Sequence, residues 1–158
     1  MSRREARESA MKVLYSQEID QSANLEQAKE LFLANYPLPE EDLLFFDQLI
    51  AGVLEHRKDL DLAVAPRLSG WTIDRLPKVD LTILRIALYE LIFTEYVPNN
   101  VAIAEAVRLA KTYSDDAARQ YINAVLGNLN RELDELSTKQ PELSAKNLLN
   151  ELEQDPKS

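Results

Sequence analysis

The sequence contains no cysteine, only three glycines and a single histidine, His56, among its 158 residues. Without cysteine, disulfides, thiolate zinc sites and cysteine nucleophiles are excluded. A single imidazole argues against a multi-histidine metal site and against a Ser-His-Asp triad, so we expect His56 to lie on the surface of a helix. Three glycines are too few for a Gly-rich phosphate loop or for a sheet protein with many tight turns.

Long apolar runs are also absent. No stretch approaches the roughly 18 residues of a membrane span, and the N-terminal MSRREARES lacks the apolar region of a signal peptide. We therefore expect a cytoplasmic protein, with neither a cofactor nor a metal. The net charge of −9 repels nucleic acid, so any RNA contact requires a local basic patch or a basic partner.

The most apolar part of the chain is Trp71–Leu91, WTIDRLPKVDLTILRIALYEL. After Pro77 nearly every position as far as Phe93 is apolar, and a helix with apolar residues all round must be covered on all sides. This pattern predicts a central helix. Its polar residues fall in one narrow sector, which we expect to reach water or a partner: Lys78, Thr82, Arg85 and Tyr89.

Apolar periodicity and breakers predict the other helices. Together with the central one, they give an all-α protein of about seven helices with short connections, at about 2–18, 25–36, 40–54, 60–67, 78–93, 101–113 and 115–136. Gly52 is predicted to allow a close helix crossing, and Trp71 to cover the core. After Leu136 the composition becomes polar and acidic, so we interpret residues 137–158 as a mobile or weakly helical tail outside a domain at 1–136.

The first predicted helix carries two stripes. One should pack inward: Ala6, Ala10, Val13, Leu14 and Gln17. The other interleaves cations with an aromatic residue: Arg4, Arg7, Met11 and Tyr15, with Arg3 and Lys12 close by. RNA-binding surfaces use this combination, because cations bind phosphates and aromatic rings stack on unpaired bases. The alternative is an ordinary surface helix in which the arginines pair with Glu5 and Glu8.

Three stretches resemble the NusB family of bacterial transcription antitermination proteins. They are RREARESAMKVLYS at Arg3–Ser16, the central stretch around ILRIALYEL, and VPNNVAIAEAVRLAKTYSDDAARQYINAVL at Val97–Leu126. The resemblance covers about Ser2–Leu136. It implies two packed three-helix-like subdomains and a non-enzymatic factor that binds the boxA RNA of ribosomal RNA leader transcripts. It also implies a partner, the small-subunit ribosomal protein that acts as NusE, within a transcribing RNA polymerase complex.

The resemblance also assigns site residues. The arginines and lysine would hold phosphates while the tyrosines stack on bases, so the predicted RNA-binding set is Arg3, Arg4, Arg7, Lys12, Tyr15, Tyr113, Arg119, Gln120 and Tyr121. The segment that the family presents to its ribosomal partner would include Asp74, Lys78, Asp80 and Arg85. Acidic residues there suit a basic partner, which would supply positive charge to an acidic protein.

Two positions depart from the family pattern. Ala104 replaces the Asn common in a VAINEA motif, and Ala124 replaces the Gly of an F-V-N-G-V-L motif, while Asn123 is retained. Local packing or partner geometry should differ there. Charge also suggests that the acidic tail shields the basic helix when RNA is absent.

Two other functions remain open from the sequence. A helical protein–protein adaptor without RNA binding would have Arg4, Arg7 and Tyr15 buried or paired with Glu5 and Glu8. An RNA-modifying enzyme is disfavoured, because the chain has no cysteine nucleophile, no Gly-rich loop and no room for a Rossmann-type domain. Homodimerisation through the partner-type surfaces is left undecided.

Overall fold

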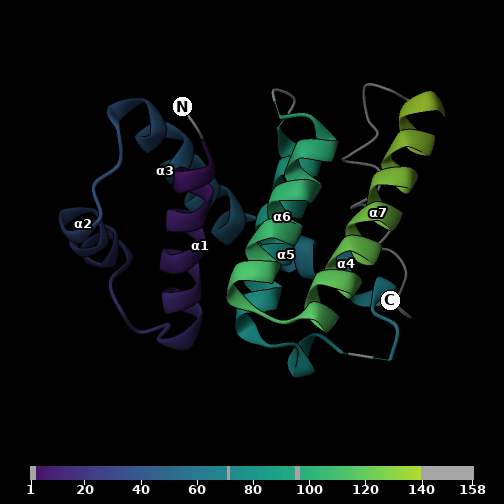
Figure 1. The fold of residues 1–158 in the computed structure, drawn as a ribbon, viewed down its shortest axis with the longest axis horizontal. Helices are drawn as coiled ribbons and strands as arrows, with labels where there is room; N and C mark the ends of the chain where they lie inside the picture. Colours follow the sequence, from purple (N-terminus) through teal and green to yellow (C-terminus); the bar gives the residue numbers. More distant parts are fainter. Residues whose placement is uncertain (1–2, 71, 95–96, 140–158) are drawn as a thin grey trace.

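Helices make up nearly all of the computed structural model, which describes residues 3–70, 72–94 and 97–139. Seven α-helices and two 3-10 turns are present in this part of the chain, and no strand (Figure 1). Their bounds are α1 Arg3–Ile19, α2 Leu25–Asn35, α3 Glu40–Glu55, α4 Arg57–Val64, η1 Ala65–Arg67, η2 Ile73–Arg75, α5 Lys78–Phe93, α6 Asn99–Tyr113 and α7 Asp116–Lys139. The all-α prediction of about seven helices is confirmed.

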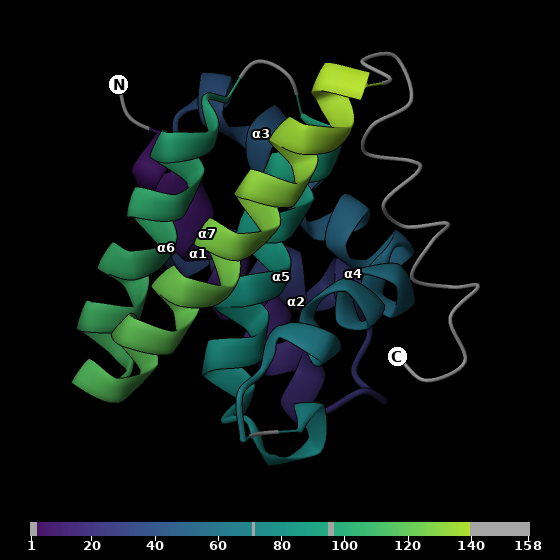
Figure 2. The same cartoon turned by 90° about the vertical axis from the view of Figure 1, so that its right-hand side faces the viewer.

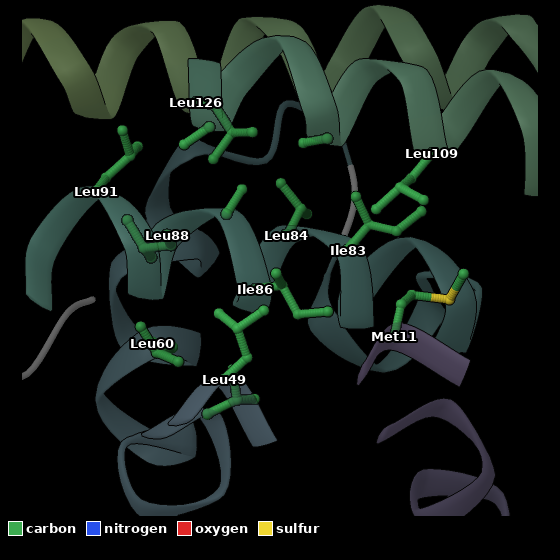
Figure 3. Packing of buried hydrophobic residues seen from close by; sticks show 14 of the residues in the cluster. Met11, Leu49, Leu60, Ile83, Leu84, Ile86, Leu88, Leu91, Leu109 and Leu126 are labelled. Atoms are coloured by element: carbon green, nitrogen blue, oxygen red, sulfur yellow. The ribbon is translucent and has the colours of Figure 1, made fainter. Parts of the chain in front are cut away.

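The central helix is α5, as the sequence predicted. Twelve of its sixteen residues are buried, because α1, α3, α4, α6 and α7 all pack against it (Figure 2). Figure 3 shows Leu84 and Leu88 facing α6 and α7, and Ile86 close to Leu49 of α3. Truncating a fully buried leucine such as Leu84 to alanine should cost about 2–5 kcal/mol, so this interior contributes much of the stability.

The helices form two groups around α5. Helix α1 packs with α2 and α3, and α5 packs with α6 and α7, while α1 and α5 join the two groups (Figure 1). Helix α7 runs antiparallel to α6, whereas α1 and α6 run in the same direction (Figure 1). This arrangement places the N-terminal arginines beside α6 and not at a free edge.

The polar sector of α5 was predicted to reach water or a partner, but in the structure it is mostly covered by the chain itself. Lys78 is exposed and Tyr89 is half-buried, but Thr82 and Arg85 are buried. The Arg85 guanidinium donates to Asp61 at 2.8 and 2.9 Å and to Glu18 at 2.8 Å. The carboxylate of Asp61 on α4 therefore offsets the buried charge of Arg85.

The structure adds several local details. The α7 N-cap is Asp115, because the Asp115 carboxylate accepts the Ala118 N–H at 2.8 Å. Phe45 is buried in α3, while Leu43 on the same helix is half-buried. His56 lies at the α3–α4 junction with its ring stacked on Phe93 at 4.0 Å between centroids.

Gly52 permits the predicted close crossing. A Cβ atom at this position would overlap the Tyr89 ring, so α3 and α5 approach each other here as they could not with a larger residue. Helix α7 continues to Lys139, beyond the predicted domain boundary at Leu136. Ser2, Trp71 and the rest of the predicted tail lie outside the described residues. In the described part, no helix is both long and apolar enough to cross a membrane.

Candidate nucleic-acid interface

Arg7 is the most deeply placed of the arginines that begin α1. It is only 5% exposed, and its Nε donates to both carboxylate oxygens of Glu90 on α5, at 2.9 and 3.0 Å. Its guanidinium also lies 5.2 Å from the centre of the Phe45 ring. Arg7 was predicted to contact RNA, but its guanidinium is buried and joins α1 to α5.

Glu105 of α6 is surrounded by three arginines. It accepts hydrogen bonds from Arg4 at 3.3 and 3.1 Å and from Arg108 at 3.3 Å, and lies 4.0 Å from Arg7. Burial alone would raise the pKa of Glu105, but the hydrogen bonds from Arg4 and Arg108 outweigh burial and hold that pKa below its ordinary value. The carboxylate therefore stays ionised and fixes three guanidinium groups at one seam between α1 and α6.

Arg3 and Arg4 occupy the exposed edge of this cluster. The Arg3 guanidinium lies 4.8 Å from the centre of the Phe45 ring on α3, a cation–π arrangement. The side chain of Arg4 is 59% exposed although it is bound to Glu105. Both residues therefore present cationic groups to solvent from fixed positions.

Lys12 places a further positive charge along the same seam between α1 and α6. Its Nζ lies 5.6 Å from the centre of the Tyr113 ring on α6 and 5.8 Å from that of Tyr36 at the end of α2. The step from Arg4 to Lys12 on α1 equals the step from Glu105 to Tyr113 on α6, which agrees with parallel helices in fixed register. Tyr15 is 38% exposed on the following turn of α1, and Tyr113 is 36% exposed.

The start of α7 adds polar groups at the same end of α6, since Ser114 and Asp115 alone separate the two helices (Figure 1). Gln120 is exposed, and half-buried Arg119 lies 3.4 Å from Asp116. Tyr121 is also half-buried, and its hydroxyl donates to Asp80 of α5. Burial and the Asp80 carboxylate raise the pKa of Tyr121 far above its ordinary range, so the phenol remains a donor.

Of the four residues predicted to bind the ribosomal partner, two are exposed and two are buried. Asp74 in η2 and Lys78 at the start of α5 are exposed at one end of the bundle. Asp80 and Arg85 are buried and bound within the chain, to Tyr121 and to Asp61 with Glu18 respectively. These two residues can position a partner surface, but they do not form one.

Three residues of this site were not predicted from the sequence: Tyr36, Glu90 and Glu105. Tyr36 was treated only as the end of a helix, and Glu90 and Glu105 were not recognised as partners of Arg7 and Arg4. The only sequence signal for the two glutamates was a carboxylate on a largely apolar helix face, which usually requires a buried cation. In the described ranges, no group of three or more carboxylate or histidine side chains is arranged to hold a metal ion.

A protein–protein adaptor was expected to have Arg4, Arg7 and Tyr15 buried or paired, and the structure meets this expectation only in part. Arg7 is buried and Arg4 is paired, although with Glu90 and Glu105 and not with Glu5 and Glu8. Tyr15, Lys12 and Tyr113 remain accessible on the same surface. The cationic and aromatic character needed for RNA is therefore centred on Lys12 and not on Arg7.

Comparison with known proteins places this chain in a family. The sequence model described as the NusB family matches residues 4–131. The chain is 42% identical over 132 residues to the transcription antitermination protein NusB of Exiguobacterium sp., an alignment covering 84% of this chain and 99% of that protein. It is 39% identical over 135 residues to the protein of the same name from Clostridium novyi, with coverage of 82% and 98%.

Solved structures agree with this placement. The fold matches T. maritima NusB with a TM-score of 0.77 and 30% identity, covering 84% of this chain and 92% of that one. It also matches a structure described as antitermination factors NusB and NusE in complex with dsRNA, with a TM-score of 0.74, 25% identity and coverage of 83% and 98%. The chain belongs to the NusB family.

Proposed function

We propose that this protein is a transcription antitermination factor that binds boxA-type RNA together with the ribosomal protein that acts as NusE. The observation that carries the proposal is the Lys12 cluster, in which one exposed ammonium lies within 6 Å of the centres of two exposed tyrosine rings on a fixed helix seam. Family membership and the match to a NusB–NusE–RNA structure support the same function.

The RNA path that we propose follows the seam between α1 and α6. Arg3, Arg4 and Lys12 bind phosphates, and Tyr15 and Tyr113 stack on unpaired bases. Arg119 and Gln120 extend the path at the start of α7, with the Tyr121 ring beside them. Because few phosphates are contacted and the chain has a net charge of −9, binding by the protein alone should be weak.

The ribosomal partner compensates for this weakness. We propose that it binds near Asp74 and Lys78, where exposed polar groups lie at the η2–α5 end of the bundle. A basic partner on an acidic protein supplies positive charge beside the RNA path and steers association. The assembly would act in the cytoplasm with transcribing RNA polymerase and without an enzymatic step. The same exposed surfaces would serve any homodimer formed when the partner is absent.

Fluorescence anisotropy tests this proposal directly. Labelled boxA RNA and a scrambled RNA are titrated with the protein, with and without the ribosomal partner, at two salt concentrations. We expect selective binding that tightens with the partner and has a steeper salt dependence. Absence of RNA binding in every combination, with the partner still bound, would support the adaptor function, which the internal pairing of Arg4 and Arg7 favours.

A further inference from the structure

A groove lies between α1 and the end of α2, beside the Lys12 cluster. Its α1 wall is polar, and its opposite wall is mainly aromatic and apolar. The lining residues are Glu5, Glu8, Ser9 and Lys12 from α1, and Phe32, Asn35, Tyr36, Pro37 and Leu38 from α2 and the segment after it.

Tyr36 gives the groove an exposed ring that is held in place. It is 62% exposed, although its backbone N–H donates to the Phe32 carbonyl at 2.8 Å and closes the end of α2. The Tyr36 ring lies 5.2 Å from the Phe32 ring, and Phe32 in turn packs against the core. An aromatic face fixed in this way can stack on a flat group with little loss of side-chain entropy.

Lys12 connects this groove to the proposed RNA path. Its Nζ lies 5.8 Å from the centre of the Tyr36 ring and 5.6 Å from that of Tyr113. A phosphate bound at Lys12 would therefore have an aromatic ring on each side. One adjoining base could stack on Tyr113 in the main path, and the base on the other side of the phosphate could enter the groove.

The charges in the groove favour a base over a phosphate. Glu5 and Glu8 line its α1 wall, and carboxylates repel phosphates and acidic peptides. The same carboxylates accept hydrogen bonds from base N–H groups, as they do from the cytosine amino group in DNA recognition. Guanine offers two adjacent donors on its Watson–Crick edge, and uracil offers one.

We propose that the groove is a binding site for one unpaired nucleobase, adjacent to the phosphate held by Lys12, and that it prefers guanine over uracil. The base stacks on Tyr36, and a Glu8 or Glu5 carboxylate accepts its N–H donors. This proposal rests on the RNA-binding function proposed above, and gives it base specificity at one position.

Position scanning of boxA RNA tests the groove. Abasic substitutions are introduced one position at a time, and anisotropy is measured with the ribosomal partner present, for the wild type, Tyr36→Ala and Leu31→Ala. Leu31 is an exposed α2 residue outside the groove and serves as the matched control. We expect Tyr36→Ala to weaken binding by about 5- to 150-fold, the range for loss of one stacked base, and Leu31→Ala to leave it unchanged.

The position scan then identifies the base. One abasic position should weaken wild-type binding by a similar factor and have almost no effect on Tyr36→Ala, while Tyr36→Phe should retain the wild-type profile. At that position, guanine should bind more tightly than uracil, and Glu8→Gln combined with Glu5→Gln should reduce the difference. Circular dichroism and sedimentation confirm that the variants keep the fold and oligomeric state.

Several results would overturn the proposal. If Tyr36→Ala keeps the wild-type affinity and position profile while Lys12→Ala weakens binding, the groove takes no base although the RNA function stands. If Tyr36→Ala changes the oligomeric state and not the RNA profile, the groove is instead a contact between copies of this chain. If the wild type itself binds no RNA, the proposed function fails together with the groove.

Discussion

Arg7 of α1 and Glu90 of α5 form a buried ion pair with a bifurcated hydrogen bond, in which the guanidinium Nε lies 2.9 and 3.0 Å from the two carboxylate oxygens. The side chains are 6% and 1% exposed, so neither charge has access to much water. The pair joins the arginine-rich helix to the central helix of the fold. It therefore fixes where the exposed groups of α1 lie relative to α6.

Breaking this pair should destabilise the protein strongly. Arg7→Ala leaves the Glu90 carboxylate buried without its cation, and we expect the free energy of unfolding to fall by about 3–5 kcal/mol. The double variant Arg7→Met with Glu90→Leu removes both charges at similar volume and should lose much less. Urea unfolding followed by circular dichroism measures both. A loss below about 1 kcal/mol for Arg7→Ala would contradict the structural role assigned to the pair.

Glycine substitutions should have opposite effects at two positions. Gly52→Ala should cost about 1–3 kcal/mol, because the added methyl group would overlap the Tyr89 ring at the α3–α5 crossing. Gly127→Ala is the matched control on α7. Among the described residues, its Cβ would meet only the Arg131 side chain, at 3.8 Å, so the variant should be about 0.5–1 kcal/mol more stable. Thermal unfolding of both variants checks the prediction, and equal effects would refute the close crossing.

Tyr121→Phe should separate a structural contact from an RNA contact. The change removes the hydroxyl that donates to buried Asp80, so we expect a loss of about 1–3 kcal/mol in stability. The ring remains available for stacking, so affinity for boxA RNA should stay within about twofold of wild type. Chemical unfolding and anisotropy on the same preparations test this. A large loss of RNA affinity in a folded Tyr121→Phe variant would show that the hydroxyl itself contacts RNA.

The free energy of unfolding should fall at acid pH, because Glu18 and Glu105 are carboxylates bound to arginines in the folded state. For both Glu18 and Glu105, burial alone would raise the pKa, but arginine hydrogen bonds prevail and lower it from the ordinary value of 4.5. Between the lowered pKa and the ordinary value, the folded state therefore binds fewer protons than the unfolded state. Stability from these groups is present at neutral pH and is lost as pH falls below about 5.

Urea unfolding at a series of pH values measures this effect. Glu105→Gln should be less stable than wild type at pH 7, and its stability should fall less steeply below about pH 5 because one of the linked carboxylates is gone. Glu30→Gln, an exposed position on α2, provides the control. Identical pH dependence for wild type and Glu105→Gln would contradict the role of Glu105 as an ionised centre for three arginines.

The central helix and its neighbours could be predicted because their signals are local. The apolar run after Pro77 requires burial on every side, and Pro98 marks the start of the next helix, which begins at Asn99, two residues before the predicted position. The inward stripe of α1 followed from helical periodicity for the same reason. The prediction was wrong where a polar residue on a helix face was expected to reach water or a partner, as with Arg85, whose guanidinium binds Asp61 and Glu18.

The ion pairs could not be predicted because they join residues far apart in sequence. Arg7 and Glu90 are 83 positions apart, and Arg4 and Glu105 are 101. Only the packing of α1 between α3 and α5 brings them together. The contact between Lys12 and Tyr36 could not be predicted either, because it depends on how the end of α2 packs beside α1. The sequence therefore predicted an RNA-binding helix that included both Arg7 and Lys12, and in the structure Arg7 is buried while Lys12 is exposed.

The salt dependence of boxA RNA binding by Lys12→Ala tests the central claim most directly. Anisotropy titrations at several salt concentrations, with the ribosomal partner present, compare it with wild type and with Lys58→Ala, an exposed lysine of α4. Lys12→Ala should bind more weakly, and its slope of log K against log salt should be shallower by about 0.7–1, the value for one phosphate contact. Lys58→Ala should match wild type. If Lys12→Ala keeps both the affinity and the slope of wild type, the seam between α1 and α6 is not the RNA-binding surface.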